Sequence, residues 1–351
     1  MENVKSKGYA GKDDSGKLSY WEFERRPVGD DDVLIEIKFA GICHSDLHTI
    51  MGDWGAQQYP QVPGHEIAGI VKQVGLNVTS FKVGDKAGVG CMVNSCGTCD
   101  NCKDSEEQFC EKGPVWTYGN PEEREPTGIT QGGYSNNIVV DKHFVIKIPE
   151  SLDLQHAAPL LCAGITTYSP LLKANVKPGD KVGVAGIGGL GHMAIKLAVA
   201  KGAQVYAFTT SPKKVEDALS FGAKEAIIVD SLDKLAPYKG KLDYMISTIP
   251  AQFDVAAYAN VVKPYGSFTQ VGMPPGMSLN ISAIGLSINR VNFNASLIGG
   301  ISATRDVVKF CAENKVYPTI EIIDPKDIND AWQRELKKDV RYRFVIDMSK
   351  L

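Results

Sequence analysis

The sequence predicts an α/β protein in two parts, a strand-rich domain and a doubly wound parallel sheet. Three observations lead to this fold class. Residues 33–149 contain short apolar or alternating runs that glycine or proline bounds. From about residue 180 onward, strand and helix patterns alternate, as in a parallel sheet with helices on both faces. The length of 351 residues is enough for two domains, each with its own core.

The strand-rich region is expected to be a β domain with many loops. Its candidate strands lie within residues 32–41, 64–75, 82–90 and 132–149. In the second region, KVGVAG (181–186) predicts a strand, LGHMAIKLAVAK (190–201) a helix and QVYAFT (204–209) the next strand. A helix at 213–222 and strands at 226–230, 242–249 and 266–272 continue the alternation. Helices at 305–314 and 328–338 and a strand at 341–348 could extend either domain.

Composition and charge narrow the class of function. The 38 basic and 41 acidic residues give a net charge of −3, which argues against a nucleic-acid partner. The N-terminal stretch is polar and the longest apolar stretches are short, so we expect neither a secretory signal nor a membrane span. The expected location is cytoplasmic. In that reducing compartment, clustered cysteines are more often metal ligands than disulfides.

Four cysteines lie close together in CGTCDNCKDSEEQFC. Cys96, Cys99 and Cys102 are separated by two residues each, and Cys110 follows after seven more. Four thiolates would saturate a tetrahedral zinc ion, so we expect a closed, structural site. Free thiols or two disulfides are the alternatives. A nucleic-acid-binding zinc ribbon is disfavoured because the loop between the cysteines is acidic.

A second metal site would have to come from residues far apart in the chain. Cys43 in GICHSDLH, His65 in VPGHEIAG and Cys162 in PLLCAGIT are the candidates. Two thiolates and one imidazole, with an open fourth position, form a known catalytic zinc arrangement. Spacing alone does not show that the three side chains meet. Taken singly, Cys162 in its apolar run could be a buried thiol and His65 a structural histidine.

A glycine-rich turn predicts a dinucleotide site. The glycines follow a predicted strand and open a predicted helix, as a pyrophosphate-binding turn requires, although a purely structural turn is the alternative. The turn consists of Gly186, Gly188, Gly189, Leu190 and Gly191.

The end of the next strand predicts which dinucleotide binds. An NAD enzyme usually has an acid there, whereas this chain has Thr209, Thr210 and Ser211, then Lys213 and Lys214. Hydroxyls and positive charge at this point favour NADP(H).

Several motifs in order carry a family resemblance. Gly64-His65-Glu66-x-x-Gly69, with Gly75 and Val78 beyond, resembles the signature of the zinc-containing alcohol dehydrogenases of the medium-chain dehydrogenase/reductase superfamily. GICHSD, PLLCAGIT, SLIGGI and DVRYRFVID look most like the cinnamyl alcohol dehydrogenase branch and its bacterial aldehyde-reductase relatives. The resemblance implies a GroES-like catalytic domain at 1–163 and 298–351, with a structural zinc lobe at about 91–113. It also implies a Rossmann NADP-binding domain at 164–297.

The resemblance also assigns catalytic roles. Cys43, His65 and Cys162 would bind a catalytic zinc ion, and the four clustered cysteines a structural one. Glu66 resembles the carboxylate that approaches the zinc transiently, and Asp46 the carboxylate that fixes the His65 imidazole. Ser45 and His48 would pass a proton between substrate and solvent, with the cofactor ribose between them. Their alternative roles are a helix-capping serine and an exposed histidine.

Further positions follow for cofactor and substrate. The resemblance implies that Thr166, Val271, Ser296 and Ile298 lie against the nicotinamide and that Arg343 approaches the pyrophosphate. Core packing is the alternative for Val271 and Ile298. An apolar substrate channel is expected from Met51, Trp54, Trp116 and Met273 together with Ile298. Loop tryptophans serve local packing equally often.

The expected function is reversible hydride transfer between NADP(H) and primary alcohols or aldehydes, with two zinc ions per chain. Bulky or aromatic aldehydes are the expected small-molecule substrates. A polyol or secondary-alcohol dehydrogenase is one alternative, and an inactive zinc-stabilised binding protein is another. The resemblance suggests a homodimer formed by the coenzyme domains, with NFNASLI (292–298) at the interface.

Overall fold

The chain forms two compact units in a computed structural model that describes residues 2–351. The first unit runs up to Cys162 and resumes at Gly299–Leu351, and the second is Ala163–Ile298. The chain therefore leaves the first unit directly after Cys162 and returns to it directly after Ile298.

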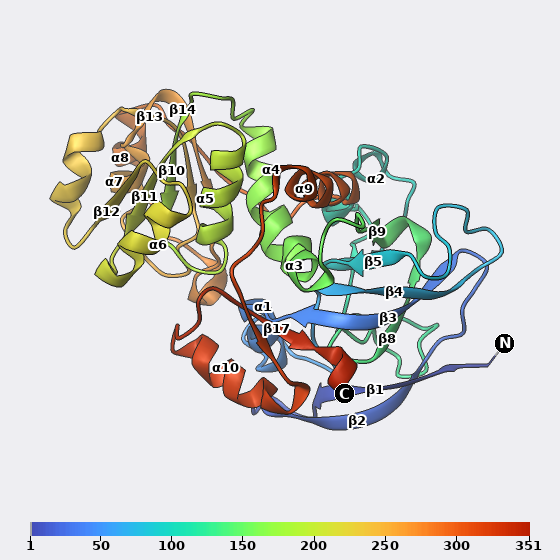
Figure 1. Cartoon of the computed structure of the whole chain (residues 1–351). Coiled ribbons are helices and arrows are strands. Elements are labelled where there is room, and N and C mark those ends of the chain that lie inside the picture. The colour runs from blue at the N-terminus through green and yellow to red at the C-terminus, as the bar shows by residue number, and fades with distance from the viewer. Residues whose placement is uncertain (1) are drawn as a thin grey trace. The chain divides into compact units, whose positions relative to one another are not determined.

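The first unit is built around a sheet of seven strands. The strand order is β16-β17-β3-β4-β5-β9, and β8 also pairs with β3. Figure 1 shows β17, in red, beside β3, in blue, so the end of the chain completes a sheet that begins near its start. The strands are β3 (Asp32–Gly41), β4 (Ile67–Val74), β5 (Lys86–Val89), β8 (Asn137–Asp141), β9 (Val145–Lys147), β16 (Ile320–Ile323) and β17 (Arg343–Asp347).

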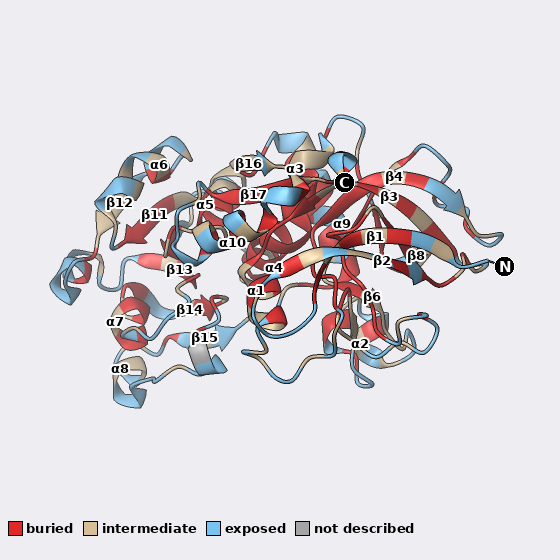
Figure 2. Cartoon of the chain, turned by 90° about the horizontal axis from the view of Figure 1, so that it is seen from below, coloured by how far each residue is buried: buried red, intermediate tan, exposed pale blue. Residues whose placement is uncertain are grey.

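Two short sheets and several helices complete the first unit. The hairpin of β1 (Val4–Gly11) and β2 (Leu18–Arg25) is antiparallel, as is the pair of β6 (Met92–Asn94) and β7 (Val115–Trp116). The helices are α1 (His44–Ile50), α2 (Asp100–Lys103), α3 (Leu154–Pro159), α9 (Ile301–Asn314) and α10 (Ile328–Leu336). In Figure 2, β3 and the first half of β4 are mostly buried, as expected for central strands that carry an apolar sequence, whereas the second half of β4 is partly exposed.

The second unit is a parallel sheet of six strands with the order β12-β11-β10-β13-β14-β15. Its central strand, β10 (Lys181–Ala185), has the sequence KVGVA and is buried at every residue except Lys181. The other strands are β11 (Gln204–Thr209), β12 (Glu225–Ile228), β13 (Leu242–Ser247), β14 (Val262–Gln270) and β15 (Asn292–Ala295). The helices are α4 (Ile165–Lys173), α5 (Gly191–Ala200), α6 (Val215–Ser220), α7 (Val255–Ala259) and α8 (Ala283–Ser287).

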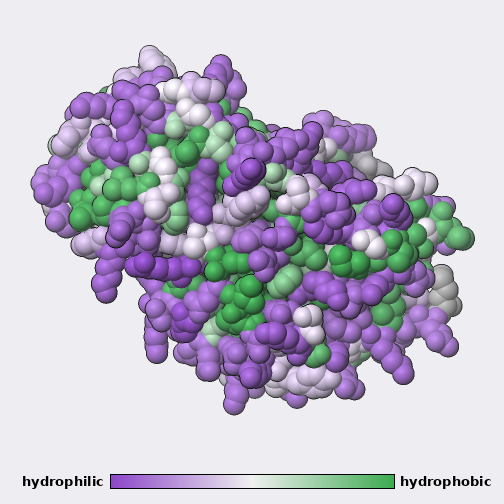
Figure 3. All heavy atoms as spheres, in the orientation of Figure 1, coloured by the Kyte–Doolittle hydropathy of each residue, from purple (hydrophilic) through white to green (hydrophobic). Residues whose placement is uncertain are grey.

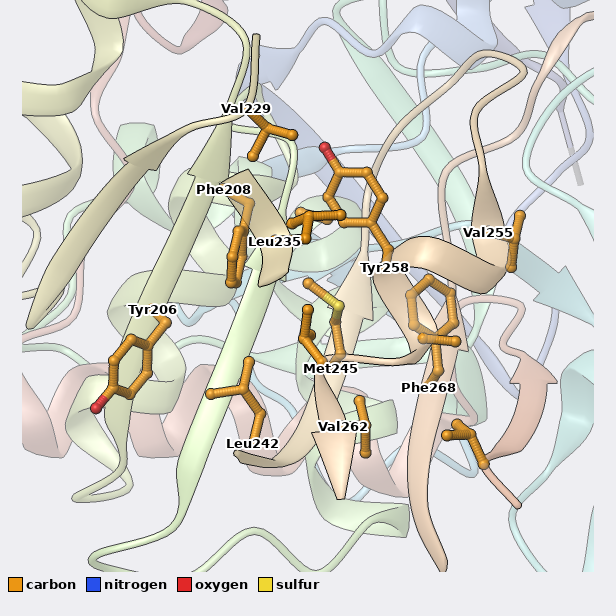
Figure 4. Packing of buried hydrophobic residues seen from close by; sticks show 14 residues of the cluster. Tyr206, Phe208, Val229, Leu235, Leu242, Met245, Val255, Tyr258, Val262 and Phe268 are labelled. Carbon is orange, nitrogen blue, oxygen red and sulfur yellow. The ribbon is translucent and has the colours of Figure 1, made fainter. Parts of the chain in front are cut away.

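Apolar side chains from neighbouring strands form the core of this second unit. Figure 4 shows Phe208, Met245 and Phe268, from three strands of the sheet, gathered near Tyr258 of α7. The rings of Phe208 and Tyr258 pack edge to face with centroids 6.3 Å apart. This core fixes the strands whose carboxyl ends carry the predicted cofactor residues.

On the face shown in Figure 3, hydrophilic side chains surround small groups of hydrophobic ones. Across residues 2–351, none of the helices has both the length and the apolar character needed to cross a bilayer.

Candidate active site

Three of the predicted metal ligands meet in the first unit. Donor atoms of Cys43, His65 and Cys162, together with a Glu66 carboxylate oxygen, all lie within 4.8 Å of one another. Cys162 Sγ lies 3.9 Å from Cys43 Sγ and 3.2 Å from His65 Nε2. A tetrahedral zinc ion with Zn–S bonds of about 2.3 Å requires sulfurs about 3.8 Å apart. The donor set and its spacing therefore fit zinc.

The strand pairing explains how two of these ligands come together. Cys43 follows the end of β3 and His65 precedes the start of β4, and the two strands pair with Ala40 opposite Ile67. The third ligand, Cys162, lies in a single π-helical turn, η3 (Leu160–Gly164), that continues α3. Single π-helical turns of this kind often occur at functional sites, where they redirect a side chain.

The Asp46 carboxylate lies against the His65 imidazole, the partner that the resemblance implies for it. The carboxylate is fully buried and accepts a hydrogen bond from His65 Nδ1 at 2.9 Å. Burial alone would lower the pKa of His65, but the Asp46 carboxylate outweighs it and raises that pKa. The Cys162 side chain lowers the pKa of Cys43 well below its ordinary value, with His65 adding to the effect against burial. The neighbouring Cys43 and Cys91 thiols, together with burial, raise the pKa of Cys162 in turn, so of the two thiols it is Cys43 that the site favours as a thiolate.

Glu66 and Arg343 form a buried ion pair beside the ligands. Burial alone would lower the pKa of Arg343, but the Glu66 carboxylate raises it, so the guanidinium stays charged. The pairing gives Arg343 a partner that the sequence analysis did not foresee. Its approach to a pyrophosphate stays a prediction.

The four clustered cysteines form a second donor set. Sγ atoms of Cys96, Cys99, Cys102 and Cys110 lie within 4.8 Å of one another, with Cys96 Sγ 3.9 Å from Cys102 Sγ. Backbone N–H groups of Thr98 and Cys99 lower the pKa of Cys96 to about 5, whereas burial raises that of Cys102 to about 11. All eight cysteines within residues 2–351 are free thiols. The geometry fits a closed tetrahedral zinc site and contains neither of the two disulfides considered as an alternative.

The loop that carries these cysteines is anchored to the start of helix α9. Glu107, in the short turn η1 (Glu107–Phe109), is 1% exposed. Its Oε2 accepts a hydrogen bond from Ile301 N at 2.9 Å, and its Oε1 lies 2.7 Å from His143 Nε2. Gly300 fits only as glycine, because a Cβ there would lie 1.7 Å from Ser105 O. The lobe therefore caps the helix that begins where the chain re-enters the first unit.

The glycine turn of the second unit has the geometry of a dinucleotide site. Gly186 follows β10 with φ of +86°, a conformation that glycine adopts without strain. A Cβ at Gly191 would lie 2.0 Å from Gly186 O, so close packing of the helix requires glycine there. A Cβ at Gly188 would meet nothing within 4 Å, which leaves room for a ligand to approach the backbone. These are the three uses of glycine in a pyrophosphate-binding turn.

The end of β11 carries hydroxyl groups and no carboxylate. Thr209 ends the strand, and its hydroxyl accepts a hydrogen bond from Ser211 N at 3.1 Å. Lys214 follows in the turn η4 (Pro212–Lys214), and its Nζ donates to Ile187 O at 2.5 Å. A positive charge therefore lies against the glycine turn.

Comparison with known proteins identifies the family. Residues 29–150 match the alcohol dehydrogenase GroES-like domain, and residues 189–313 match the zinc-binding dehydrogenase domain. NADP-dependent alcohol dehydrogenase C 1 of Mycolicibacterium smegmatis is 50% identical over 347 residues, which cover 98% of each chain. The chain belongs to the zinc-containing alcohol dehydrogenases. The predicted fold class, a GroES-like domain with a Rossmann domain, is confirmed.

Two solved structures of zinc-containing alcohol dehydrogenases share the whole fold. The cinnamyl alcohol dehydrogenase of Helicobacter pylori, solved with NADP(H), is 45% identical, covers 99% of each chain and has a TM-score of 0.93. A cinnamyl alcohol dehydrogenase of Sorghum bicolor is 40% identical, covers 98% of each chain and has a TM-score of 0.94. The predicted branch within the family is thereby confirmed.

The predicted proton-relay residues of this zinc-containing alcohol dehydrogenase lie on helix α1. Ser45 Oγ lies 3.5 Å from Cys43 Sγ, close to the ligand cluster. His48, one turn further along, lies with Nδ1 2.7 Å from Asp53 Oδ2. His44, which had no predicted role, lies 3.0 Å from Glu335 Oε1.

The predicted cofactor residues of the second unit lie at one edge of its sheet. Val271 follows β14, and Ser296 and Ile298 follow β15. The carboxyl ends of parallel strands share one edge, which also carries the glycine turn and Thr209. Thr166 is buried in α4. Their contacts with the nicotinamide stay predictions.

The predicted substrate residues are spread over both units. Trp54 stacks on His48 with ring centroids 5.3 Å apart, an arrangement the sequence analysis did not predict. Trp116 lies in β7, Met51 follows α1, and Met273, which follows β14, is partly exposed. The apolar channel itself stays a prediction.

Sequence reasoning missed two aromatic residues next to the metal ligands. Tyr118 stacks on the His65 ring at 5.9 Å, and the Tyr134 hydroxyl donates to Asp46 Oδ2 at 2.8 Å. Both side chains are buried. Single tyrosines in loops carry no periodicity or spacing signal, so only the folded chain reveals them.

Proposed function

We propose that this alcohol dehydrogenase interconverts primary alcohols and aldehydes with NADP(H) and a catalytic zinc ion. The observation that carries the proposal is the donor set of Cys43, His65 and Cys162. Two thiolates and an imidazole leave one position of a tetrahedral ion for a substrate oxygen. The four-cysteine lobe has no such open position, so its zinc would be structural.

The metal, the coenzyme and the surrounding side chains then have distinct roles in the reaction. When bound, zinc polarises the substrate oxygen and the nicotinamide supplies or takes the hydride. The Ser45 hydroxyl and the His48 imidazole pass the proton between the substrate oxygen and solvent. Because His48 Nδ1 donates to Asp53, its Nε2 is the nitrogen that exchanges the proton. Asp46 holds the His65 ring, and Glu66 can approach the ion when Arg343 releases it.

NADP(H) is the proposed coenzyme because of the residues that follow β11. Thr209, Thr210 and Ser211 offer hydroxyl groups to a 2′-phosphate, and Lys214 offers positive charge. A carboxylate at this point would instead bind the 2′-hydroxyl of NAD and repel the phosphate. The M. smegmatis relative is named as NADP-dependent and the H. pylori relative was solved with NADP(H), which supports the same choice.

Bulky or aromatic aldehydes are the proposed substrates. Large side chains at Met51, Trp54, Trp116 and Met273 would give the substrate an apolar surface, which favours aromatic groups. Two relatives named as cinnamyl alcohol dehydrogenases support this class.

A substrate panel tests the proposed function. Cinnamaldehyde, benzaldehyde, butanal and the alcohol mannitol are each assayed with the NADP and NAD forms of the coenzyme, and zinc is counted by mass spectrometry. We expect two zinc ions per chain and the highest kcat/KM for an aromatic aldehyde with NADPH. A higher kcat/KM with NADH would refute the coenzyme assignment. Preference for mannitol would indicate a polyol dehydrogenase, and no turnover of any compound would indicate a binding protein.

The edge strand β15 supports the proposal of a homodimer. Three of its four residues are exposed, and an unpaired edge strand readily pairs with another chain. Ile284 and Ile288, in and after the neighbouring α8, are 70% and 68% exposed. Sedimentation velocity should show a dimer that Ile284→Glu with Ile288→Glu converts to a monomer. The control Ile322→Glu, at an exposed isoleucine of β16, should leave the dimer intact. A wild-type monomer would refute the proposal.

A further inference from the structure

The Asp46 carboxylate has all of its hydrogen-bonding positions occupied. Oδ1 accepts hydrogen bonds from Gly64 N at 3.2 Å and from His65 Nδ1 at 2.9 Å. Oδ2 accepts from Cys43 N at 3.1 Å and from the Tyr134 hydroxyl at 2.8 Å. An ionised carboxylate offers about four acceptor positions, so none is left over. One carboxylate thus holds the backbone of one metal ligand and the ring of another.

Tyr134 is the one of these four donors that belongs to neither ligand-bearing segment. Its backbone is fixed at both ends, since its N–H donates to Pro63 O at 3.0 Å and its carbonyl accepts from Tyr9 N at 2.9 Å. The side chain is 0% exposed. Its hydroxyl therefore has little freedom to bind anything other than Asp46.

The Tyr134 ring also explains a glycine next to a metal ligand. Gly64 has φ of +105°, and a Cβ there would lie 2.5 Å from Cδ1 of the Tyr134 ring. The ring thus lies directly over the backbone that precedes His65. Tyr134 contacts the ligand segment through packing and the carboxylate through a hydrogen bond.

We propose that Tyr134 is a positioning residue of the catalytic zinc site. Its hydroxyl fixes the plane of the Asp46 carboxylate, which then fixes the Cys43 backbone and the His65 ring. Without the hydroxyl, Oδ2 loses one of the two hydrogen bonds that hold it and keeps the one from Cys43 N. The Tyr118 hydroxyl, which also interacts with Asp46, can then draw the carboxylate away from its paired positions. The inference rests on the catalytic zinc site proposed above and adds a residue outside the ligand and relay sets.

The test compares Tyr134→Phe with the wild type in the zinc-loaded full chain. The phenyl ring keeps the packing over Gly64 and removes only the hydroxyl. The rate at which zinc is transferred to a chromophoric chelator is measured. In a second sample cobalt replaces zinc, and its visible bands distinguish the catalytic site from the structural site because they depend on the ligands and their geometry. We expect faster release of one ion by about 10-fold, the lower end of the effect of losing a direct partner of a metal ligand. We also expect shifted cobalt bands and a lower kcat with a nearly unchanged KM for NADPH.

A matched control and a second variant make the result decisive. Tyr244 is a buried tyrosine whose hydroxyl has no hydrogen-bond partner among residues 2–351, so Tyr244→Phe should leave zinc release and the cobalt bands unchanged. Incorporating 3-fluorotyrosine at position 134 keeps the ring and strengthens the donor, so it should slow zinc release even if the phenylalanine variant folds poorly. Wild-type release rates and cobalt bands in both position-134 variants would overturn the inference. A wild-type protein that binds no catalytic zinc would instead overturn the proposed function.

Discussion

Removing the charge of Glu107 should loosen the four-cysteine lobe from helix α9. Glu107→Gln keeps the shape of the side chain and removes its negative charge. The hydrogen bonds with Ile301 N and His143 Nε2 are then no longer made to a charged group. A hydrogen bond to a charged group contributes about 1 kcal/mol more than a neutral one, and the negative charge at a helix N-terminus adds about 0.5 kcal/mol. Since two hydrogen bonds and one helix N-terminus are affected, the expected loss is about 2.5 kcal/mol.

Differential scanning calorimetry of the zinc-loaded protein measures this loss. For a unit of about 200 residues, a loss of about 2.5 kcal/mol lowers Tm by about 5–10 °C. The decrease in Tm should appear in the unfolding transition of the first unit and not in that of the second unit. Glu111→Gln, at an exposed glutamate of the same lobe, is the control and should leave Tm unchanged.

The same variant should change how stability depends on pH. Burial would raise the pKa of Glu107, but the hydrogen bonds from His143 and the Ile301 amide outweigh it and lower the pKa below its ordinary value of 4.5. A carboxyl group with a lowered pKa stabilises the fold above its unfolded-state pKa, and this stabilisation is lost as pH falls through the folded-state value. The Tm difference between wild type and Glu107→Gln should be full at pH 6–8 and shrink below pH of about 4.5. Equal Tm values at pH 7 would refute the anchoring role.

Three further predictions concern the metal sites, the relay and the coenzyme. Cys162→Ser should lower kcat by about 100-fold or more in a protein that still folds. Cys99→Ser should instead lower Tm and release the structural zinc. A stable but inactive Cys99→Ser protein would contradict the assignment of one zinc site to catalysis and the other to stability. His48→Gln should lower kcat by about 10-fold near pH 7, and a variant as fast as the wild type across the pH profile would exclude His48 from the proton path. Thr209→Asp should lower the ratio of kcat/KM for NADPH to that for NADH by about 10-fold or more, because a carboxylate repels the 2′-phosphate; an unchanged ratio would mean that the phosphate binds elsewhere.

The sequence predicted the motifs made of neighbouring residues better than the way in which distant residues come together in the site. The glycine turn and the four-cysteine lobe were visible because their residues are close in the chain and their spacing follows from one strand–helix unit or one loop. Cys43 and His65 meet because β3 and β4 pair in one register, which the spacing of the two residues does not reveal.

The contacts that the sequence did not predict join distant segments. Arg343 pairs with Glu66 across 277 positions, and Tyr134 reaches Asp46 across 88. The hairpin of β1 and β2 was missed because its strands are polar, with buried residues only at intervals. Such contacts depend on which surfaces meet after folding, and no short-range pattern records them.

The position of Cys162 bears on how this enzyme could be recombined with its relatives. Cys162, a proposed metal ligand, is the last residue of the first unit, and the next residue, Ala163, already belongs to the second. A chimaera that takes its coenzyme unit from another member must therefore be joined inside the π-helical turn Leu160–Gly164. The junction at Ile298 and Gly299 carries none of the proposed metal ligands. Exchange of the second unit between relatives would therefore alter the backbone around Cys162 at the first junction. It would leave the proposed metal ligands unchanged at the second junction.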